Sequence, residues 1–187
     1  MTPTLTSERL TLRPLTAADL PDLVALNGDP EVMAFITGRA LTPAEVEADL
    51  PGLTRSEGGL GLWSGTDDDG FAGVWFLIAD PDDESAAEIG WRLPRNRWGH
   101  GLATEGARAL LTHAFETLGT ELVWAETMAV NSRSRAVMER LGMRHARTEV
   151  REWEDPIPGW EQGEVVYELT RPTGLTSSRR GPWPPSG

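Results

Sequence analysis

The residues that most clearly suggest a binding site are two glycines at the start of an expected helix. Gly99 and Gly101 stand one residue apart in the stretch RNRWGHGLATEG, and a helical pattern follows at once. The first turn of a helix leaves several N–H groups unpaired and carries a partial positive charge. Glycines there let a phosphate oxygen approach those N–H groups. The glycines by themselves favour a tight turn that uses glycine for geometry alone, and a phosphate-binding loop is the chemical alternative.

Two common phosphate-binding motifs are excluded by residue type. A dinucleotide-binding fingerprint needs a third glycine three residues after the second, and that position holds Thr104. A P-loop needs a lysine, and the sequence contains none. Cysteine is absent as well, which excludes a disulfide framework, a thiolate zinc site and a cysteine nucleophile.

Hydrophobic periodicity predicts the elements that would position this loop. Apolar residues at helical spacing after the glycines predict a long helix that Gly119 ends. Three strands within residues 59–94 are expected to form an antiparallel meander, because the turn signal TDDDG joins the first two. The other expected elements are a strand (8–15), a helix capped by Thr16 and ended by Gly28, a helix that begins after Thr42, a strand (122–130), a helix (132–142) and two final paired strands.

Together these segments resemble the GNAT superfamily of acyl-CoA-dependent N-acetyltransferases. The resemblance rests on the strand AEIGWRLP, the turn WGHGLATEG, the strand VWAETMAVN and the helix SRSRAVMERLGM, in that order. The opening SERLTLRPLTAADLPDLVAL is similar to the RimJ/RimL-type ribosomal-protein N-terminal acetyltransferases. The resemblance implies one α/β (α+β) domain over residues 1–171, with a central mixed, mostly antiparallel twisted sheet flanked by helices. Residues 172–187 are rich in Pro, Gly and Ser and are expected to form a disordered tail.

The resemblance also implies acetyl-CoA as cosubstrate and no metal. The family pattern in the turn is Gln or Arg, two residues, Gly, one residue, then Gly or Ala. It falls on residues 98–103, so Trp98 stands in the Gln or Arg position, and backbone N–H groups are expected to hold the pyrophosphate. The strand 88–93 is expected to run along the pantetheine arm. The expected cofactor contacts are Ile89, Trp91, Leu93, Trp98, Gly99, His100, Gly101, Leu102, Ala103, Thr104, Asn131 and Arg135.

Three residues are candidates for catalytic proton transfer. Amine acetylation needs a neutral amine, stabilisation of charge on the carbonyl oxygen and a proton for the leaving thiolate. Many family members carry a Tyr acid in the helix after Asn131, but that position here is Met138. Ser134, one turn earlier, matches a serine that the RimL-like group uses near the thiol, and it is equally consistent with a helix first-turn residue. Glu88 and Glu152 are the candidate bases, and each is also consistent with a surface charge. The resemblance favours Glu152, because RimL-like proteins place a Glu in a similar strand before an aromatic residue, here Trp153.

The sequence therefore predicts an enzyme that transfers an acetyl group from acetyl-CoA directly to a primary amine. The acceptor is a protein N-terminus or a small-molecule amine. A non-catalytic acyl-CoA-binding sensor or partner module of the same fold is the alternative, because Trp98 and Met138 depart from the family pattern.

Charge and hydropathy constrain the partners. Seventeen basic against 29 acidic residues give a net charge of −12, which argues against nucleic acid and anionic membranes and weakly favours amine-bearing partners. No secretory signal or membrane segment is visible in the sequence, so the expected location is the cytoplasm. The family resemblance implies a monomer or a homodimer.

Overall fold

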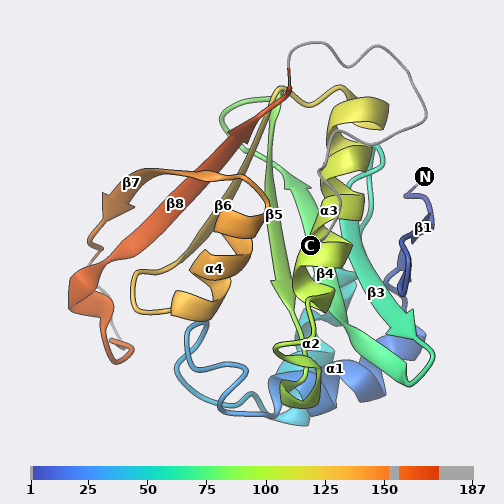
Figure 1. Cartoon of the computed structure of the whole chain (residues 1–187). Helices are drawn as coiled ribbons and strands as arrows, with labels where there is room; N and C mark the ends of the chain where they lie inside the picture. The colour runs from blue at the N-terminus through green and yellow to red at the C-terminus, as the bar shows by residue number, and fades with distance from the viewer. Residues whose placement is uncertain (1, 152–155, 173–187) are drawn as a thin grey trace.

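An eight-stranded sheet organises the protein, as the computed structural model shows (Figure 1). The structure describes residues 2–151 and 156–172, so Glu152 and the expected tail from residue 173 onward lie outside the described residues. The sheet order is β1-β2-β3-β4-β5-β6-β8-β7. The strands are β1 (Leu5–Thr6), β2 (Thr11–Pro14), β3 (Gly61–Asp67), β4 (Gly70–Ala79), β5 (Ala86–Arg92), β6 (Leu122–Met128), β7 (Arg144–Glu149) and β8 (Glu164–Thr170). The helices are α1 (Leu20–Asn27), α2 (Pro43–Leu53), α3 (Leu102–Thr112) and α4 (Ser132–Arg140).

The expected mixed, mostly antiparallel sheet is confirmed. The meander β3-β4-β5 pairs antiparallel, and so do β6 with β8 and β8 with β7. Within the described residues, β5 and β6 form the one parallel pair, and their register covers only residues 86–88 against residues 122–124. Both strands continue further, and Figure 1 shows them diverging toward the end of the sheet where α3 begins. This divergence opens the sheet at its centre.

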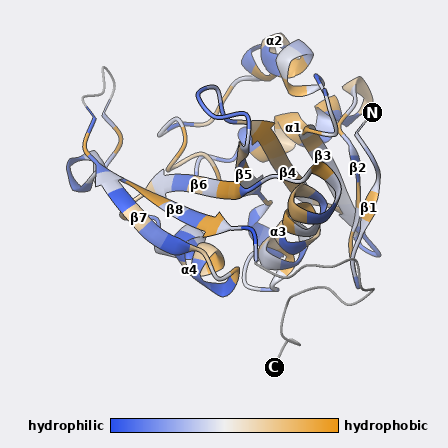
Figure 2. Ribbon diagram, turned by 90° about the horizontal axis from the view of Figure 1, so that it is seen from above, coloured by the Kyte–Doolittle hydropathy of each residue, from blue (hydrophilic) through white to orange (hydrophobic). Residues whose placement is uncertain are grey.

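Helices cover both faces of the sheet (Figure 2). One apolar cluster joins β4, β5 and β6 to α3 and α4, and it includes the fully buried Trp63 and Trp75. A smaller cluster joins Leu23 and Leu26 of α1 and Val46 of α2 to Val74 of β4. Because side chains alternate along a strand, successive residues of β5 face α3 on one side and α1 on the other.

The first expected strand is shorter than the sequence pattern indicated. Residues 8–10 belong to a tight turn between β1 and β2 rather than to a strand. Ser7 closes this turn, because its N–H donates to the Leu10 carbonyl and its Oγ accepts from the Leu10 N–H. The expected long helix extends to Gly119, but its last segment, His113–Leu118, is π-helical. A buried hydrogen bond joins the His113 ring to the Gly59 carbonyl in this segment.

Close packing of α3 on β4 fixes the start of α3. A Cβ at Gly106 would lie 2.5 Å from Cε2 of the Trp75 indole, so only glycine leaves room for the ring at this depth. The same indole donates its Nε1–H to the Ala103 carbonyl over 3.1 Å. The fully buried Trp75 therefore positions the first turn of α3 from beneath.

The Gly106→Ala variant is expected to lose about 1–3 kcal/mol of unfolding free energy, because the added methyl overpacks the Trp75 contact. Gly52→Ala in α2 is the matched control, since a Cβ there meets nothing within 4 Å. That variant should gain up to about 1 kcal/mol from helix propensity. Urea unfolding of both variants measures the difference. Equal stability of the two variants would show that the indole moves freely.

Candidate functional site

A cleft of about 1980 Å³ follows the divergence of β5 and β6. Residues from β5, the start of α3, the end of β6 and α4 line it, and so do residues from α1 and the segment after it. Past Glu88, β5 has no pairing with β6 within the described residues. Alternate N–H and C=O groups of β5 therefore face the cleft without a strand partner.

The residues from Gly99 to Thr104, here called the amide loop, form one wall of this cleft. Gly99 has φ +79° and Gly101 has φ +80°, a left-handed conformation that side chains disfavour. Among the described residues, the N–H groups of the amide loop have no backbone acceptor. Gly101 is the N-cap of α3 and gives the helix no side-chain cap. The loop therefore presents a run of free N–H donors at the positive end of a helix.

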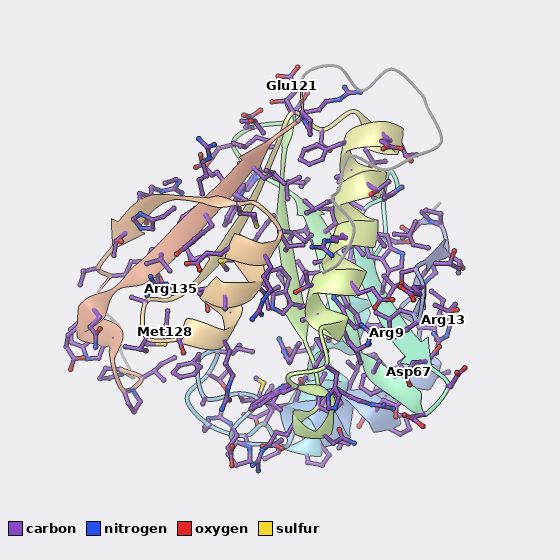
Figure 3. The ribbon with its side chains drawn as sticks, in the orientation of Figure 1. Arg9, Arg13, Asp67, Glu121, Met128 and Arg135 are labelled. Atoms are coloured by element: carbon purple, nitrogen blue, oxygen red, sulfur yellow. The ribbon has the colours of Figure 1, made fainter. Side chains whose placement is uncertain are left out.

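Side chains distant in sequence hold the amide loop in place. Arg9 donates through Nη1 to the His100 carbonyl over 3.0 Å and through Nε to Glu105 over 2.7 Å. Figure 3 shows Arg9 beside α3. Trp98 donates its indole N–H to the Leu93 carbonyl over 2.8 Å. These contacts fix the loop relative to the end of β5.

Arg133 brings a positive charge to the position before the amide loop. Its guanidinium carbon lies 4.6 Å from the centroid of the Trp98 ring, a cation–π geometry that stabilises by about 0.5–1 kcal/mol at exposed sites. Both residues line the cleft, one from α4 and one from the segment before α3. A guanidinium from another helix therefore lies over the face of the Trp98 ring.

The start of α4 forms the opposite wall of the cleft. Asn131 caps this helix, because its Oδ1 accepts from the Ser134 N–H over 3.2 Å, and its Nδ2 donates to the Thr127 hydroxyl over 3.0 Å. Ser134 and Met138 lie one turn apart and both line the cleft. The chain's one tyrosine, Tyr167, is buried on β8 and is not among the cleft-lining residues.

Arg135 points to a different part of the molecule from the other expected cofactor contacts. It is not among the residues that line the cleft. Its guanidinium donates to the Ala129 carbonyl over 3.0 Å and to the Tyr167 hydroxyl over 3.3 Å, toward β8 (Figure 3). All the other expected cofactor contacts line the cleft. The side chains of Ile89 and Leu93 are buried in the core, so β5 offers its backbone there.

Glu88 lies where β5 and β6 separate and lines the cleft. The pKa of its carboxyl is raised from 4.5 to about 7, chiefly by burial and in addition by the nearby charges of Glu126 and Asp80. A carboxyl with this pKa exchanges protons near neutral pH, which is the property a general base needs. The second candidate base, Glu152, lies outside the described residues.

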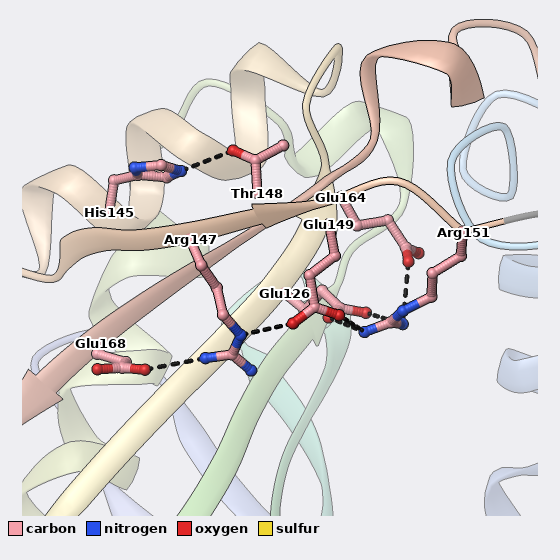
Figure 4. Close-up of polar contacts among 8 residues, drawn as sticks. All are labelled: Glu126, His145, Arg147, Thr148, Glu149, Arg151, Glu164 and Glu168. Atoms are coloured by element: carbon pink, nitrogen blue, oxygen red, sulfur yellow. Dashed lines mark hydrogen bonds and ion pairs between the residues drawn. The ribbon is translucent and has the colours of Figure 1, made fainter.

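Further acidic residues surround this end of the cleft, and sequence reasoning did not identify them. Glu126 and Glu164 line the cleft from β6 and β8. Arg151 forms ion pairs with both, at 2.9 Å and 3.0 Å, and with Glu149 at 2.8 Å (Figure 4). Burial, followed by the charge of Glu126, raises the pKa of Glu164. No local sequence signal marks this group, because its members come together only through strand pairing.

Neither a metal centre nor a membrane span emerges from the described residues. No group of His, Asp and Glu among them could hold a metal ion. None of the helices they form has the length and apolar character needed to cross a bilayer.

Comparison with known proteins yields one family and several relatives. The family model described as an acetyltransferase (GNAT) domain matches residues 9–144. The FsC-acetyl coenzyme A-N(2)-transacetylase of Aspergillus fumigatus is 38% identical over 199 residues, which cover 98% of this chain and 85% of the relative. The uncharacterized protein YkkB of Bacillus subtilis is 29% identical over 164 residues, which cover 84% of this chain and 94% of the relative.

Solved structures share the same architecture. Spermidine N-acetyltransferase from Vibrio cholerae, in complex with CoA and spermine, superposes with a TM-score of 0.74 at 19% identity, covering 87% of this chain and 96% of that one. The ribosomal L7/L12 alpha-N-protein acetyltransferase RimL, in complex with CoA, also gives a TM-score of 0.74 at 19% identity, covering 90% of this chain and 98% of that one. At this identity the likeness is one of fold.

Proposed function

The chain belongs to the GNAT acetyltransferase family, and on that premise we propose that it transfers the acetyl group of acetyl-CoA directly to a primary amine. GNAT enzymes use acetyl-CoA as cosubstrate. One observation carries the proposal: a run of free backbone N–H groups and a carboxyl with a pKa of about 7 line the same cleft.

The amide loop is proposed to bind the diphosphate of the cosubstrate. Its free N–H donors and the positive end of α3 suit a phosphate ligand, and Gly99 and Gly101 place no side chain in the way. Arg133 adds a cation next to the loop. The unpaired edge of β5 beyond Glu88 offers further N–H and C=O groups to the extended arm. Acetyl-CoA supplies the activated acetyl group.

Glu88 is proposed to take the proton from the acceptor amine. A bond forms between the amine nitrogen and the acetyl carbon, and the carbon–sulfur bond breaks. The amine proton passes to Glu88, either directly or through one water. The Ser134 hydroxyl is proposed to relay a proton from water to the leaving sulfur, taking one up as it donates its own. Glu152 stays an alternative base.

The charges at the same end of the cleft support a cationic acceptor. Glu88, Glu126 and Glu164 together favour a cationic amine over an anionic partner. The most similar of the relatives described above is named as an N(2)-transacetylase, which supports a small-molecule amine. The opening segment's resemblance to the RimJ/RimL group supports a protein N-terminus.

Release of coenzyme A thiol across a panel of acceptors tests the proposal. The panel contains spermine, amino acids and peptides with free N-termini, each with acetyl-CoA and the full chain. We expect thiol release above the rate of acetyl-CoA hydrolysis with at least one class, and mass spectrometry should find the acetylated amine. Binding of acetyl-CoA without thiol release on any acceptor would contradict the proposal and favour an acyl-CoA sensor.

A further inference from the structure

An uncompensated guanidinium lies on the α1-facing side of β5, in the same cleft as Glu88. Residues 88, 90 and 92 of β5 share this side because side chains alternate along a strand. Arg92 lines the cleft and contacts α1 through Asn27. We call the surface formed by Glu88, Gly90 and Arg92 the acceptor face.

Arg92 has more hydrogen-bond donors than there are acceptors beside it. Its Nη1 donates to the Asn27 Oδ1 over 2.5 Å. Its buried Nε has no hydrogen-bond partner, and no carboxylate of residues 2–151 or 156–172 forms an ion pair with it. Arg97 also lines the cleft and also has a buried Nε without a partner, but it differs from Arg92 in its charge balance, because its Nη2 pairs with Asp67 at 3.1 Å. Burial lowers the pKa of Arg92, yet a guanidinium keeps its charge at neutral pH.

Asn27 adds to this excess of donors. The side chain is buried, with 3% exposure, and lines the cleft. Its amide oxygen faces the guanidinium, so its NH₂ group points elsewhere and has no recorded partner in the part of the chain that the structure describes. Arg92 and Asn27 together therefore offer N–H groups with no protein acceptor for most of them. A group that only accepts hydrogen bonds and carries negative charge matches such a set.

An apolar floor separates this donor pair from Glu88. Gly90 lies between the two residues on the acceptor face, and the Phe76 ring covers it so closely that a Cβ there would overlap the ring. Four residues of strand span about 13 Å between the Cα atoms of residues 88 and 92. Both side chains are long, so a molecule with a few carbon atoms between two polar ends can reach both.

We propose that Arg92 and Asn27 bind a carboxylate on the acceptor while Glu88 receives the amine, so that the acceptor is an amino carboxylate. This inference rests on the proposed acetyl transfer and specifies its substrate class. It also agrees with the acidic surface, because the amine end of a zwitterion meets Glu88, Glu126 and Glu164, while the partly buried guanidinium of Arg92 receives the opposite end.

A matched series of acceptors tests the inference. The series contains the ω-amino acids from glycine to 6-aminohexanoate and the carboxamide of each one. With the wild-type protein, kcat/KM for at least one carboxylate should exceed that of its carboxamide about tenfold or more. Arg92→Gln should remove this preference through a higher KM for the carboxylate, and the KM of the carboxamide should rise much less, because its neutral oxygen gains less from the guanidinium charge. Arg92→Lys should restore part of the preference.

Arg95→Gln is the matched control variant. This variant also removes one positive charge near the cleft, because Arg95 pairs at 2.8 Å with Glu31, which lines the cleft. Arg95 itself is exposed and is not among the cleft-lining residues. The variant should keep the full preference for the carboxylate. Arg92→Gln should unfold at the same temperature as the wild type or higher, because it removes a partly buried charge that has no described carboxylate partner, and the glutamine NH₂ can still donate to the Asn27 Oδ1. A large drop in its unfolding temperature would show that the Arg92 charge is neutralised within the protein and would overturn the inference.

Two outcomes separate this inference from the proposed function. Transfer to neutral amines with equal rates for carboxylate and carboxamide would overturn the inference and leave acetyl transfer intact. If no acceptor releases thiol, calorimetric titration of the carboxylate series into the CoA-bound protein still tests whether Arg92 binds a carboxylate. Binding by the wild type but not by Arg92→Gln supports the carboxylate site, whereas no binding by either overturns it.

Discussion

Acetyl-CoA is expected to bind the Gly99→Ala variant about tenfold more weakly than the wild type, a loss of about 1.4 kcal/mol. A Cβ at Gly99 meets nothing within 4 Å, and because Gly99 lines the cleft, the methyl group would project into open space beside the free N–H groups. It would keep a phosphate oxygen from reaching hydrogen-bond distance. Isothermal titration calorimetry with acetyl-CoA measures the change in affinity.

Gly142→Ala separates this effect from backbone strain. Gly142 has φ +82° and Gly99 has φ +79°, and a Cβ at either position meets nothing within 4 Å. Both variants should therefore lose about 1–2 kcal/mol of unfolding free energy from the left-handed conformation. Gly142 is not among the cleft-lining residues, so its variant should keep wild-type affinity. Equal affinities in the two variants would mean that the amide loop does not hold the diphosphate.

The Glu88→Gln variant is expected to lose about a hundredfold or more in kcat, because glutamine cannot accept the amine proton. Its affinity for acetyl-CoA should stay the same, since the amide loop is unchanged. In the wild type, activity should rise with pH through an apparent pKa of about 7, where the carboxylate forms. That rise should be missing in the variant. Steady-state kinetics between about pH 5 and pH 9, the span over which such a group titrates, would measure both effects.

Asp80→Asn tests the electrostatic origin of this pKa. The charge of Asp80 raises the pKa of Glu88, so its removal should shift the rise in activity to lower pH without abolishing it. The asparagine side chain of this variant keeps an oxygen that can accept from the Trp124 indole N–H, as the Asp80 carboxylate does in the wild type. An unchanged pH profile in Asp80→Asn, together with a retained rise in Glu88→Gln, would assign the titration to another group.

The same raised pKa has a consequence for stability. Ionised Glu88 is disfavoured in the folded state, so its contribution to the unfolding free energy falls as the pH rises from 4.5 to about 7. Glu88→Gln should therefore unfold at a higher temperature than the wild type at pH values above that range and at nearly the same temperature below it. Thermal unfolding at both ends of the range measures this. A carboxyl that destabilises the fold at neutral pH is consistent with the role as base that we propose for Glu88.

The sequence alone determined the elements whose signals are local. The glycine pair predicts the loop before α3, because the left-handed backbone at Gly99 and Gly101 is a property of those residues. The cap of α2 by Thr42 and the end at Gly119 of the π-helical segment that follows α3 also come from neighbouring residues. The meander β3-β4-β5 and the family resemblance depend on the same local patterns. The prediction of the first strand was wrong at residues 8–10. A hydrogen bond from the Leu10 N–H to the Ser7 hydroxyl closes a turn there, although the sequence alternates as in a strand.

Only the tertiary structure decided which side chains meet. Glu88 and Glu152 were both candidates in sequence, and burial between diverging strands is what gives Glu88 its raised pKa. Arg9 reaches the His100 carbonyl across 91 residues, and Arg92 meets Asn27 across 65. No periodicity encodes such contacts, since they depend on how the sheet pairs and which face each helix covers. Sequence thus specified the backbone loop that suits a phosphate. The charges of the proposed acceptor site, by contrast, depend on long-range packing and on the burial of Glu88 and Arg92.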